Sequence, residues 1–309
     1  MTSVLPAPPV DGEIVDLRGD ETPATAPSEP ATKPRRRPRR IAGAIFVAIG
    51  CTVALFMLFE FFATDLIYDR SQTLLLRDLQ ALVASKEATS LDWIPNEGQP
   101  VGVLSIPKIG LSTVIVQGTS SEMTQKGPGH LRGTPMPGRL GNSVILGRRT
   151  TYGSPFGRLD ELRPFDEIDV STGAGQFTYT VATIQIVRPG DQDVIGPTYD
   201  QRLTLITSSP KYLATGRYVV TAVQKGDPAA QPTVATVTLA PSELGISGDA
   251  SGIGGVLLWG ELALVAIIAA LWLRRRVSGR VAWLLATPLV IALAWAAFSA
   301  AGRFFPATL

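Results

Sequence analysis

The sequence predicts a mainly β domain, a small barrel or sandwich, that is held at a membrane by three transmembrane α-helices. Short alternating or β-branched runs recur between residues 98 and 224, with Gly and Pro turns between them. Three apolar runs outside this region are each long enough to cross a hydrocarbon core of about 30 Å as a helix. Charged residues make up 17% of the 309-residue chain, against about 25% in soluble proteins, which fits a soluble domain combined with membrane spans.

The N-terminal part of the chain is predicted to hold a tail, an anchor and a stalk. Residues 1–40 are rich in Pro, Thr and acidic residues and end in KPRRRPRR, a composition typical of disorder. Residues 41–64 are interpreted as an uncleaved transmembrane helix, because a cleaved signal peptide would have a shorter apolar stretch. Residues 65–97 are predicted to form a stalk helix and linker. One face of that helix carries Leu75, Leu79 and Leu82.

The C-terminal part is predicted to return to the membrane. A Pro/Gly/Ser/Thr-rich linker at 225–255 precedes transmembrane helices at 256–273 and 281–302, which a basic loop at 274–280 separates. The positive-inside rule places both basic tracts, and so the N-terminus, in the cytoplasm. We therefore expect a multi-pass protein of the cell membrane with its β domain and C-terminus extracytoplasmic. Nucleic acid is not an expected partner, because both tracts adjoin apolar runs.

Cysteine and histidine are almost absent from the chain. The single cysteine, Cys51, lies inside the first apolar run, where it behaves as a small apolar residue. A single cysteine excludes an internal disulfide framework and a cysteine-rich metal site. No spaced Asp/Asn cluster of the EF-hand kind is present either. The sequence therefore predicts no metal and no cofactor.

Four segments of the β domain resemble the sortase family, and most closely the actinobacterial sortases of class E type. They are IPKIGLSTVIVQGTS, KGPGHLRGTPMPG, GNSVILGRRTTYGSPFGRLDELRPFDEI and RLTLITSSPKYLATGRYVVTA. They follow one another in the family's order and at family-like spacing over nearly the whole of 98–224. The resemblance implies a closed, sortase-like β-barrel.

The resemblance also implies where the chemistry of a sortase would lie. The family's histidine, cysteine and arginine positions are occupied here by Arg148, Ser208 and Arg217. A serine hydroxyl is far less acidic than a thiol with a pKa near 8.5, so Ser208 needs a neighbouring base to attack an amide. Arg148 cannot be that base, because a guanidinium has a pKa above about 12 and no acceptor. The chain is therefore predicted to be a catalytically degenerate member.

Two residues near these positions leave alternatives open. His130 could serve Ser208 as a base if the fold brings them together, although a structural, hydrogen-bonded histidine is the favoured interpretation. Arg217 could bind an anion or orient a carbonyl, or it could be a relic that makes a salt bridge or faces water. With Arg148 close to Arg217, the groove would be strongly cationic. The predicted binding residues are Arg148, Arg217, Ser208 and His130.

The leading functional prediction is a non-catalytic binding or scaffold subunit on the outer face of the membrane. Its partner would be an envelope or membrane protein, or a cell-wall component. The alternative is an active transpeptidase or acyl transferase with Ser208 as nucleophile; a third possibility is that the spans carry the interaction. Glu60 and Glu261 lie near the outer ends of their spans, where a water-exposed carboxylate is favoured over a partner-facing one.

Overall fold

The computed structural model describes residues 37–89, 93–225, 241–245, 252–276 and 278–308. Most of the predicted tail therefore lies outside the described residues. The chain divides into two compact units, residues 1–48 and 49–309. The first unit contributes the beginning of helix α1, Arg37–Leu58, and everything below concerns the second.

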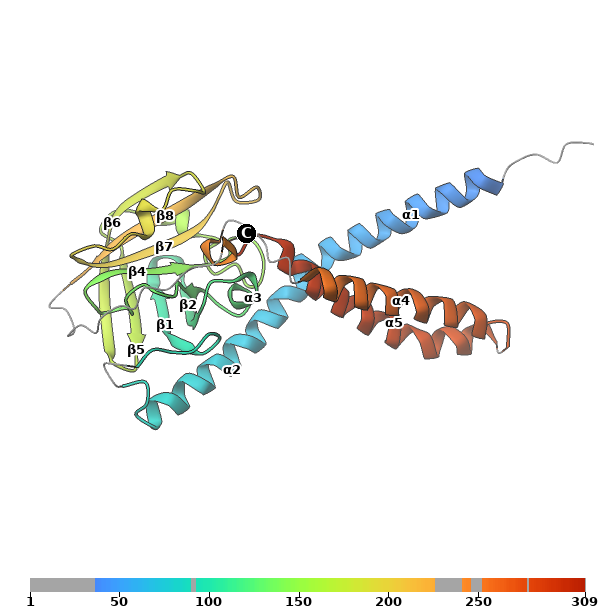
Figure 1. Cartoon of the computed structure of the whole chain (residues 1–309), viewed down its shortest axis with the longest axis horizontal. Helices are drawn as coiled ribbons and strands as arrows, with labels where there is room; N and C mark the ends of the chain where they lie inside the picture. The colour runs from blue at the N-terminus through green and yellow to red at the C-terminus, as the bar shows by residue number, and fades with distance from the viewer. Residues whose placement is uncertain (1–36, 90–92, 226–240, 246–251, 277, 309) are drawn as a thin grey trace, which may run out of the picture. The chain divides into compact units, whose positions relative to one another are not determined.

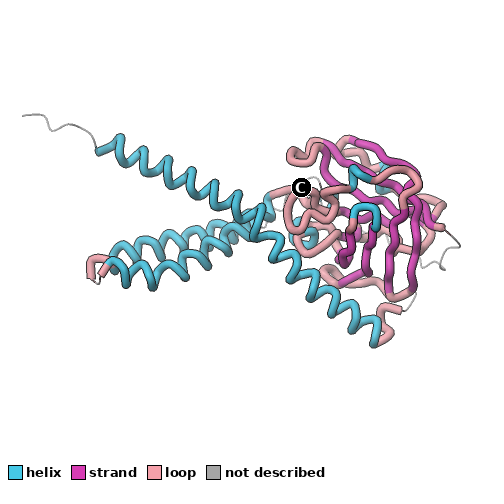
Figure 2. The backbone as a smooth tube through the Cα atoms, turned by 180° about the vertical axis from the view of Figure 1, so that it is seen from behind, coloured by secondary structure: helices cyan, strands magenta, loops and turns pink. Residues whose placement is uncertain are grey.

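Eight strands form a closed barrel in the order β1-β2-β3-β4-β7-β8-β6-β5 (Figure 1; Figure 2 shows the strands from behind). The pairs β2–β3 and β4–β7 are parallel and the other neighbours are antiparallel. This confirms the mainly β fold and the closed barrel that the resemblance implies. The strands are β1 Pro100–Ile106, β2 Leu111–Gln117, β3 Gly129–His130, β4 Gly141–Leu146, β5 Glu167–Thr172, β6 Gly175–Val187, β7 Gln201–Ser209 and β8 Gly216–Gln224.

The barrel is apolar on the inside and, unusually, also on part of its outside. Alternate residues of a strand face opposite sides of a sheet, and Leu205 and Val220 belong to the main core inside the barrel. Their neighbours Ile206 and Val219 are just as buried, in a second cluster with Leu146. Because these side chains face outward, other parts of the chain must cover this outer face.

The predicted stalk helix lies along the barrel as α2, Thr64–Ala84 (Figure 1). Leu75 and Leu79 are buried and pack on Val114 and Val116 of β2, whereas Leu82 is half-buried. Gln72 strengthens this packing, because its amide nitrogen donates to the Val114 carbonyl at 3.1 Å and its amide oxygen accepts from the Val114 N–H at 2.6 Å. The helix is thus fixed to the barrel by both apolar and polar contacts.

Two of the three predicted spans are matched by helices long and apolar enough to cross a membrane. They are Gly252–Leu273 and Gly279–Phe304, which contain the adjacent helices α4, Gly252–Leu273, and α5, Gly279–Ala301. Within the described residues, the predicted span at 41–64 contributes only a shorter apolar helix, Ile49–Leu58. A π-helical turn, Phe59–Ala63, follows and carries an acidic residue, which ends the apolar stretch. A third span is therefore a proposal.

Part of the predicted linker at 225–255 is ordered against the barrel. Residues 226–240 and 246–251 lie outside the described residues, but Pro241–Leu244 form a 3-10 turn. Glu243 of this turn is 4% exposed. Helix α4 then begins at Gly252 rather than at residue 256.

Candidate functional site

Arg148, Ser208 and Arg217 are brought together by three neighbouring strands. In the parallel pair β4–β7, Leu146 lies beside Ile206, and the Gly147 N–H donates to the Ile206 carbonyl at 3.0 Å. Arg148, which follows the end of β4, therefore lies beside the end of β7. Ser208 lies directly opposite Arg217 in the antiparallel pair β7–β8. The fold thus gathers at one end of these strands the three positions that the sequence singled out.

Ser208 lacks the partner that a serine nucleophile needs. Its side chain is 0% exposed, and its Oγ has no hydrogen-bond partner among the described residues. Its carbonyl accepts a hydrogen bond from Nη1 of Arg149 at 2.6 Å, and Nη2 of Arg149 pairs with Asp160 at 3.1 Å. This arginine holds the backbone of Ser208 but cannot accept its proton.

Arg148 is held between helix α3, Ser121–Thr124, and the loop that follows β4. Its Nη2 donates to Oγ of Ser121 at 2.8 Å and its Nη1 to Oγ1 of Thr151 at 3.1 Å. Its guanidinium carbon lies 4.8 Å from the centre of the Tyr152 ring, within cation–π range. Burial lowers the pKa of Arg148 to about 10, and the nearby Glu60 opposes that shift. Arg148 is therefore still a cation at neutral pH.

Glu60 is buried beside this arginine, and its interpretation as a water-exposed carboxylate is wrong. It is 4% exposed, and neither carboxylate oxygen has a hydrogen-bond partner among the described residues. A Cβ added to Gly302 would lie 3.0 Å from Oε1 of Glu60 and 2.8 Å from the Tyr152 hydroxyl, so the carboxylate and the phenol flank the same glycine. Glu261, in contrast, is exposed.

Arg217 is shielded from solvent. Within the described residues, no carboxylate lies at hydrogen-bond distance from it. It is 3% exposed, and its Nη2 donates to the carbonyl of Leu244 in the 3-10 turn. Burial lowers the pKa of Arg217, and the charge of Asp191 opposes that shift. The arginine therefore uses its donors on the backbone of the segment that covers it.

His130 has a structural environment and lies away from Ser208. Its Nδ1 is 2.8 Å from Oε1 of Gln117 and its Nε2 is 3.0 Å from the Pro135 carbonyl. His130 pairs with Ile145, which pairs with Leu205. Ser208 is therefore two strands across and three residues along, or about 10 Å in each direction. Both ring nitrogens are occupied, so His130 does not act as a base for Ser208.

Comparison with known proteins identifies a domain in the barrel region. Residues 104–225 match the family described as the sortase domain. The chain carries a sortase domain. It is similar to Sortase D of Bacillus subtilis (strain 168), with 31% identity over 130 residues, which are 41% of this chain and 64% of that protein. It is also similar to Sortase SrtE1 of Streptomyces coelicolor, with 28% identity over 197 residues, which are 59% of this chain and 55% of that protein.

Among solved structures, the chain is similar to sortase E from Streptomyces avermitilis. The identity is 32%, the match covers 45% of this chain and 99% of that one, and the TM-score is 0.40. The chain spans less than two thirds of the length of the two curated relatives. What the whole protein does therefore stands as a proposal.

Sequence reasoning missed several residues that build the site of the sortase domain. The resemblance singles out Arg148, which falls on the family's histidine position, and not its neighbour Arg149. Because adjacent residues at the end of a strand face opposite sides, the two arginines have different partners. Tyr152 and Ser121 bind Arg148 from outside the strands, and no sequence signal marks them. Within the described residues, no group of three or more His, Cys, Asp or Glu side chains could hold a metal ion.

The buried state of His130 predicts a loss of stability in acid. Burial lowers its pKa from 6.5 to about 4 despite the hydrogen bond to Pro135. The unfolded chain then takes up a proton before the folded one. Stability is lost as the pH falls from about 6.5 to about 4, by up to about 3 kcal/mol. His130→Gln should show a shallower fall of the melting temperature over this range, and an unchanged fall would contradict the neutral, buried histidine.

Proposed function

We propose that this chain is a membrane-anchored, catalytically inactive sortase-domain protein that serves as an extracytoplasmic binding or scaffold subunit. The observation that carries the proposal is that Ser208 has no base beside it among the described residues. Its buried Oγ has no partner among the described residues, while Arg148, at the family's histidine position, is a cation without an acceptor. Nucleophile, base and acid are thus all missing from the places where the fold would use them.

The proposed topology rests on the apolar helices and on the basic tracts. The helices Gly252–Leu273 and Gly279–Phe304 would form a hairpin in the membrane, with Arg274, Arg275 and Arg276 at its cytoplasmic tip. Together with 41–64 as a third span, this leaves the barrel on the extracytoplasmic side. The partner would be an envelope or membrane protein, or a cell-wall component.

The test is an assay of the full chain in detergent with a sorting-signal peptide and an amine acceptor. We expect neither transpeptidation nor hydrolysis above the rate without protein, and no difference between the unchanged chain and Ser208→Ala. Product that forms with the unchanged chain and disappears in Ser208→Ala would overturn the proposal and support the serine transpeptidase instead. Gly190→Ala, at an open surface position, is the matched control for a neutral substitution.

A further inference from the structure

The outer face that carries Ser208 and Arg217 is covered by the segment after helix α5. Oγ of Ser121 donates to the carbonyl of Phe305 at 3.2 Å, and Oγ1 of Thr207 lies 3.4 Å from the carbonyl of Thr308. Ala307 is 0% exposed and Thr308 is 2% exposed. The segment is therefore held through its backbone, and only small side chains enter the covered space.

A second segment, the 3-10 turn at 241–245, braces the first. The carbonyl of Glu243 accepts from Oγ1 of Thr119 at 2.6 Å, and its carboxylate pairs with Arg132 at 2.6 Å. Oγ1 of Thr308 donates to the Gly245 carbonyl at 3.0 Å. Together with the bond from Arg217 to this turn, these contacts join both segments to each other and to the barrel. We call residues 241–245 and 302–308 the cap.

We propose that the cap is a built-in peptide ligand of this outer face, and that it must leave before any other chain can reach Ser208. The barrel recognises it chiefly by donors directed at main-chain carbonyls, namely Ser121, Thr119 and Arg217. Main-chain bonds of this kind supply affinity, and the fully buried Ala307 leaves room only for a small side chain at its position. The face would therefore take a peptide with a small residue at that position from another protein once the cap is displaced.

The attachment of the cap to α5 explains how it competes with a free peptide. Residues 302–308 continue directly from α5, and Phe305 stacks on Phe56 with ring centres 6.1 Å apart. A tethered ligand acts at an effective concentration in the millimolar range, so a free peptide is excluded while the cap is in place. The proposal goes beyond the proposed function, since the cap would exclude substrates and binding partners alike.

The experiment uses a buried thiol as a reporter in the full chain. In a Cys51→Ser background, Ser208→Cys places one thiol at a position that is 0% exposed, and a maleimide reports its accessibility. Ala307→Glu, which forces a charged side chain into a fully buried position, should release the cap. We expect labelling to accelerate about tenfold or more, as for a local opening, while the cooperative melt of the barrel is retained.

A free peptide with the sequence of residues 302–308 identifies the ligand. It should slow the labelling of the Ala307→Glu chain again, whereas a scrambled peptide should not, and neither should affect the chain with an intact cap. Unchanged labelling of a folded Ala307→Glu chain, or no protection by the peptide, would overturn the proposal. If Ala307→Glu abolishes the melt, Thr308→Val, which removes the bond from Oγ1 of Thr308 to the Gly245 carbonyl within the cap, must still accelerate labelling, and failure to do so counts against the cap.

Discussion

Replacing Arg148 by methionine is expected to lower the free energy of unfolding by about 3–5 kcal/mol, the range for breaking a buried charge interaction by removing one partner. The substitution removes the donors that bind Ser121 and Thr151 and the cation over the Tyr152 ring. It also leaves the buried Glu60 without the positive charge that lies near it. Arg148→Lys should lose part of this stability, because an ammonium lacks the planar fork of donors.

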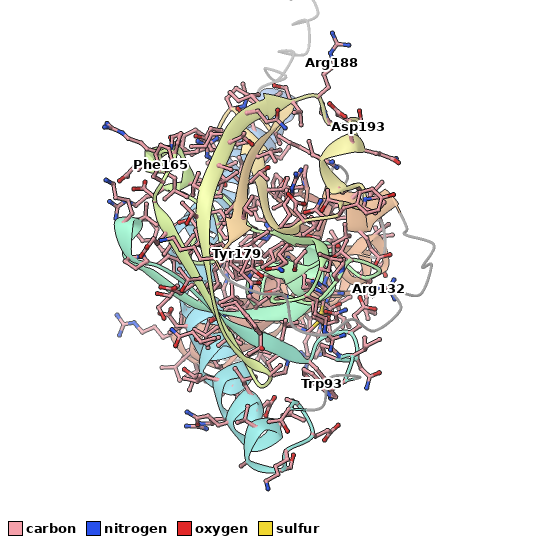
Figure 3. All side chains as sticks on the ribbon, turned by 90° about the vertical axis from the view of Figure 1, so that its left-hand side faces the viewer. Trp93, Arg132, Phe165, Tyr179, Arg188 and Asp193 are labelled. Atoms are coloured by element: carbon pink, nitrogen blue, oxygen red, sulfur yellow. The ribbon has the colours of Figure 1, made fainter. Side chains whose placement is uncertain are left out.

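Thermal and denaturant unfolding of the full chain in detergent would measure this loss. Arg188→Met is the matched control: Arg188 is exposed and projects away from the barrel in Figure 3, so its loss should change stability little. Glu60→Gln should cost less in the Arg148→Met background than in the unchanged chain, since the attraction between the two side chains is already lost there. We expect a coupling free energy of about 0.5–3 kcal/mol. Equal effects of Arg148→Met and Arg188→Met would refute the structural role of Arg148.

Gly147→Ala is expected to destabilise the barrel by about 3 kcal/mol, near the upper end for overpacking a core. A Cβ at this position would lie 2.4 Å from Cδ2 of Phe156, and Phe156 is fully buried in the main core. Because Phe156 is fully buried, either its ring or the end of β4 must shift. Gly147 also donates to the Ile206 carbonyl, and a shift of β4 would therefore disturb the alignment of Arg148 with Ser208.

Two controls accompany Gly147→Ala. One makes the same residue change at another glycine, and the other shortens the side chain of Phe156. Gly190→Ala adds a methyl group where no atom lies within 4 Å and should be neutral. Phe156→Leu in the Gly147→Ala background should restore part of the melting temperature, because it removes atoms from the site of the clash. If Gly147→Ala melts like Gly190→Ala, the close packing of this glycine on Phe156 is wrong.

The fold could be predicted because its signals are local or are carried by the resemblance. Alternation along the strands, as in Leu205 and Ile206, indicates β structure directly. The burial of Ile206 could not be predicted, since its cluster on the outside of the barrel is covered by Val187, Val194 and Ile195. The first span at 41–64 stays a prediction, and the π-helical turn at Phe59–Ala63 has no signal in the sequence.

The candidate site was predicted in its positions but not in its contacts. Strand register brings Arg148, Ser208 and Arg217 together, and the order of motifs in the sequence contains that information. The partners of these residues come from elsewhere: Glu60 precedes the barrel, and Leu244 and Thr308 follow it. A cationic groove was expected because the neutralising groups and the covering backbone are distant in sequence, and such long-range contacts leave no periodic signal.

The nucleophilicity of Ser208 tests the central claim most directly, and it can be measured without knowing a substrate. The full chain is incubated with a serine-directed fluorophosphonate, and its intact mass and peptide map are recorded beside those of Ser208→Ala. Since Oγ of Ser208 is buried and has no base among the described residues, we predict no adduct at Ser208. An adduct of one probe mass that maps to Ser208 and is absent from Ser208→Ala would contradict the account.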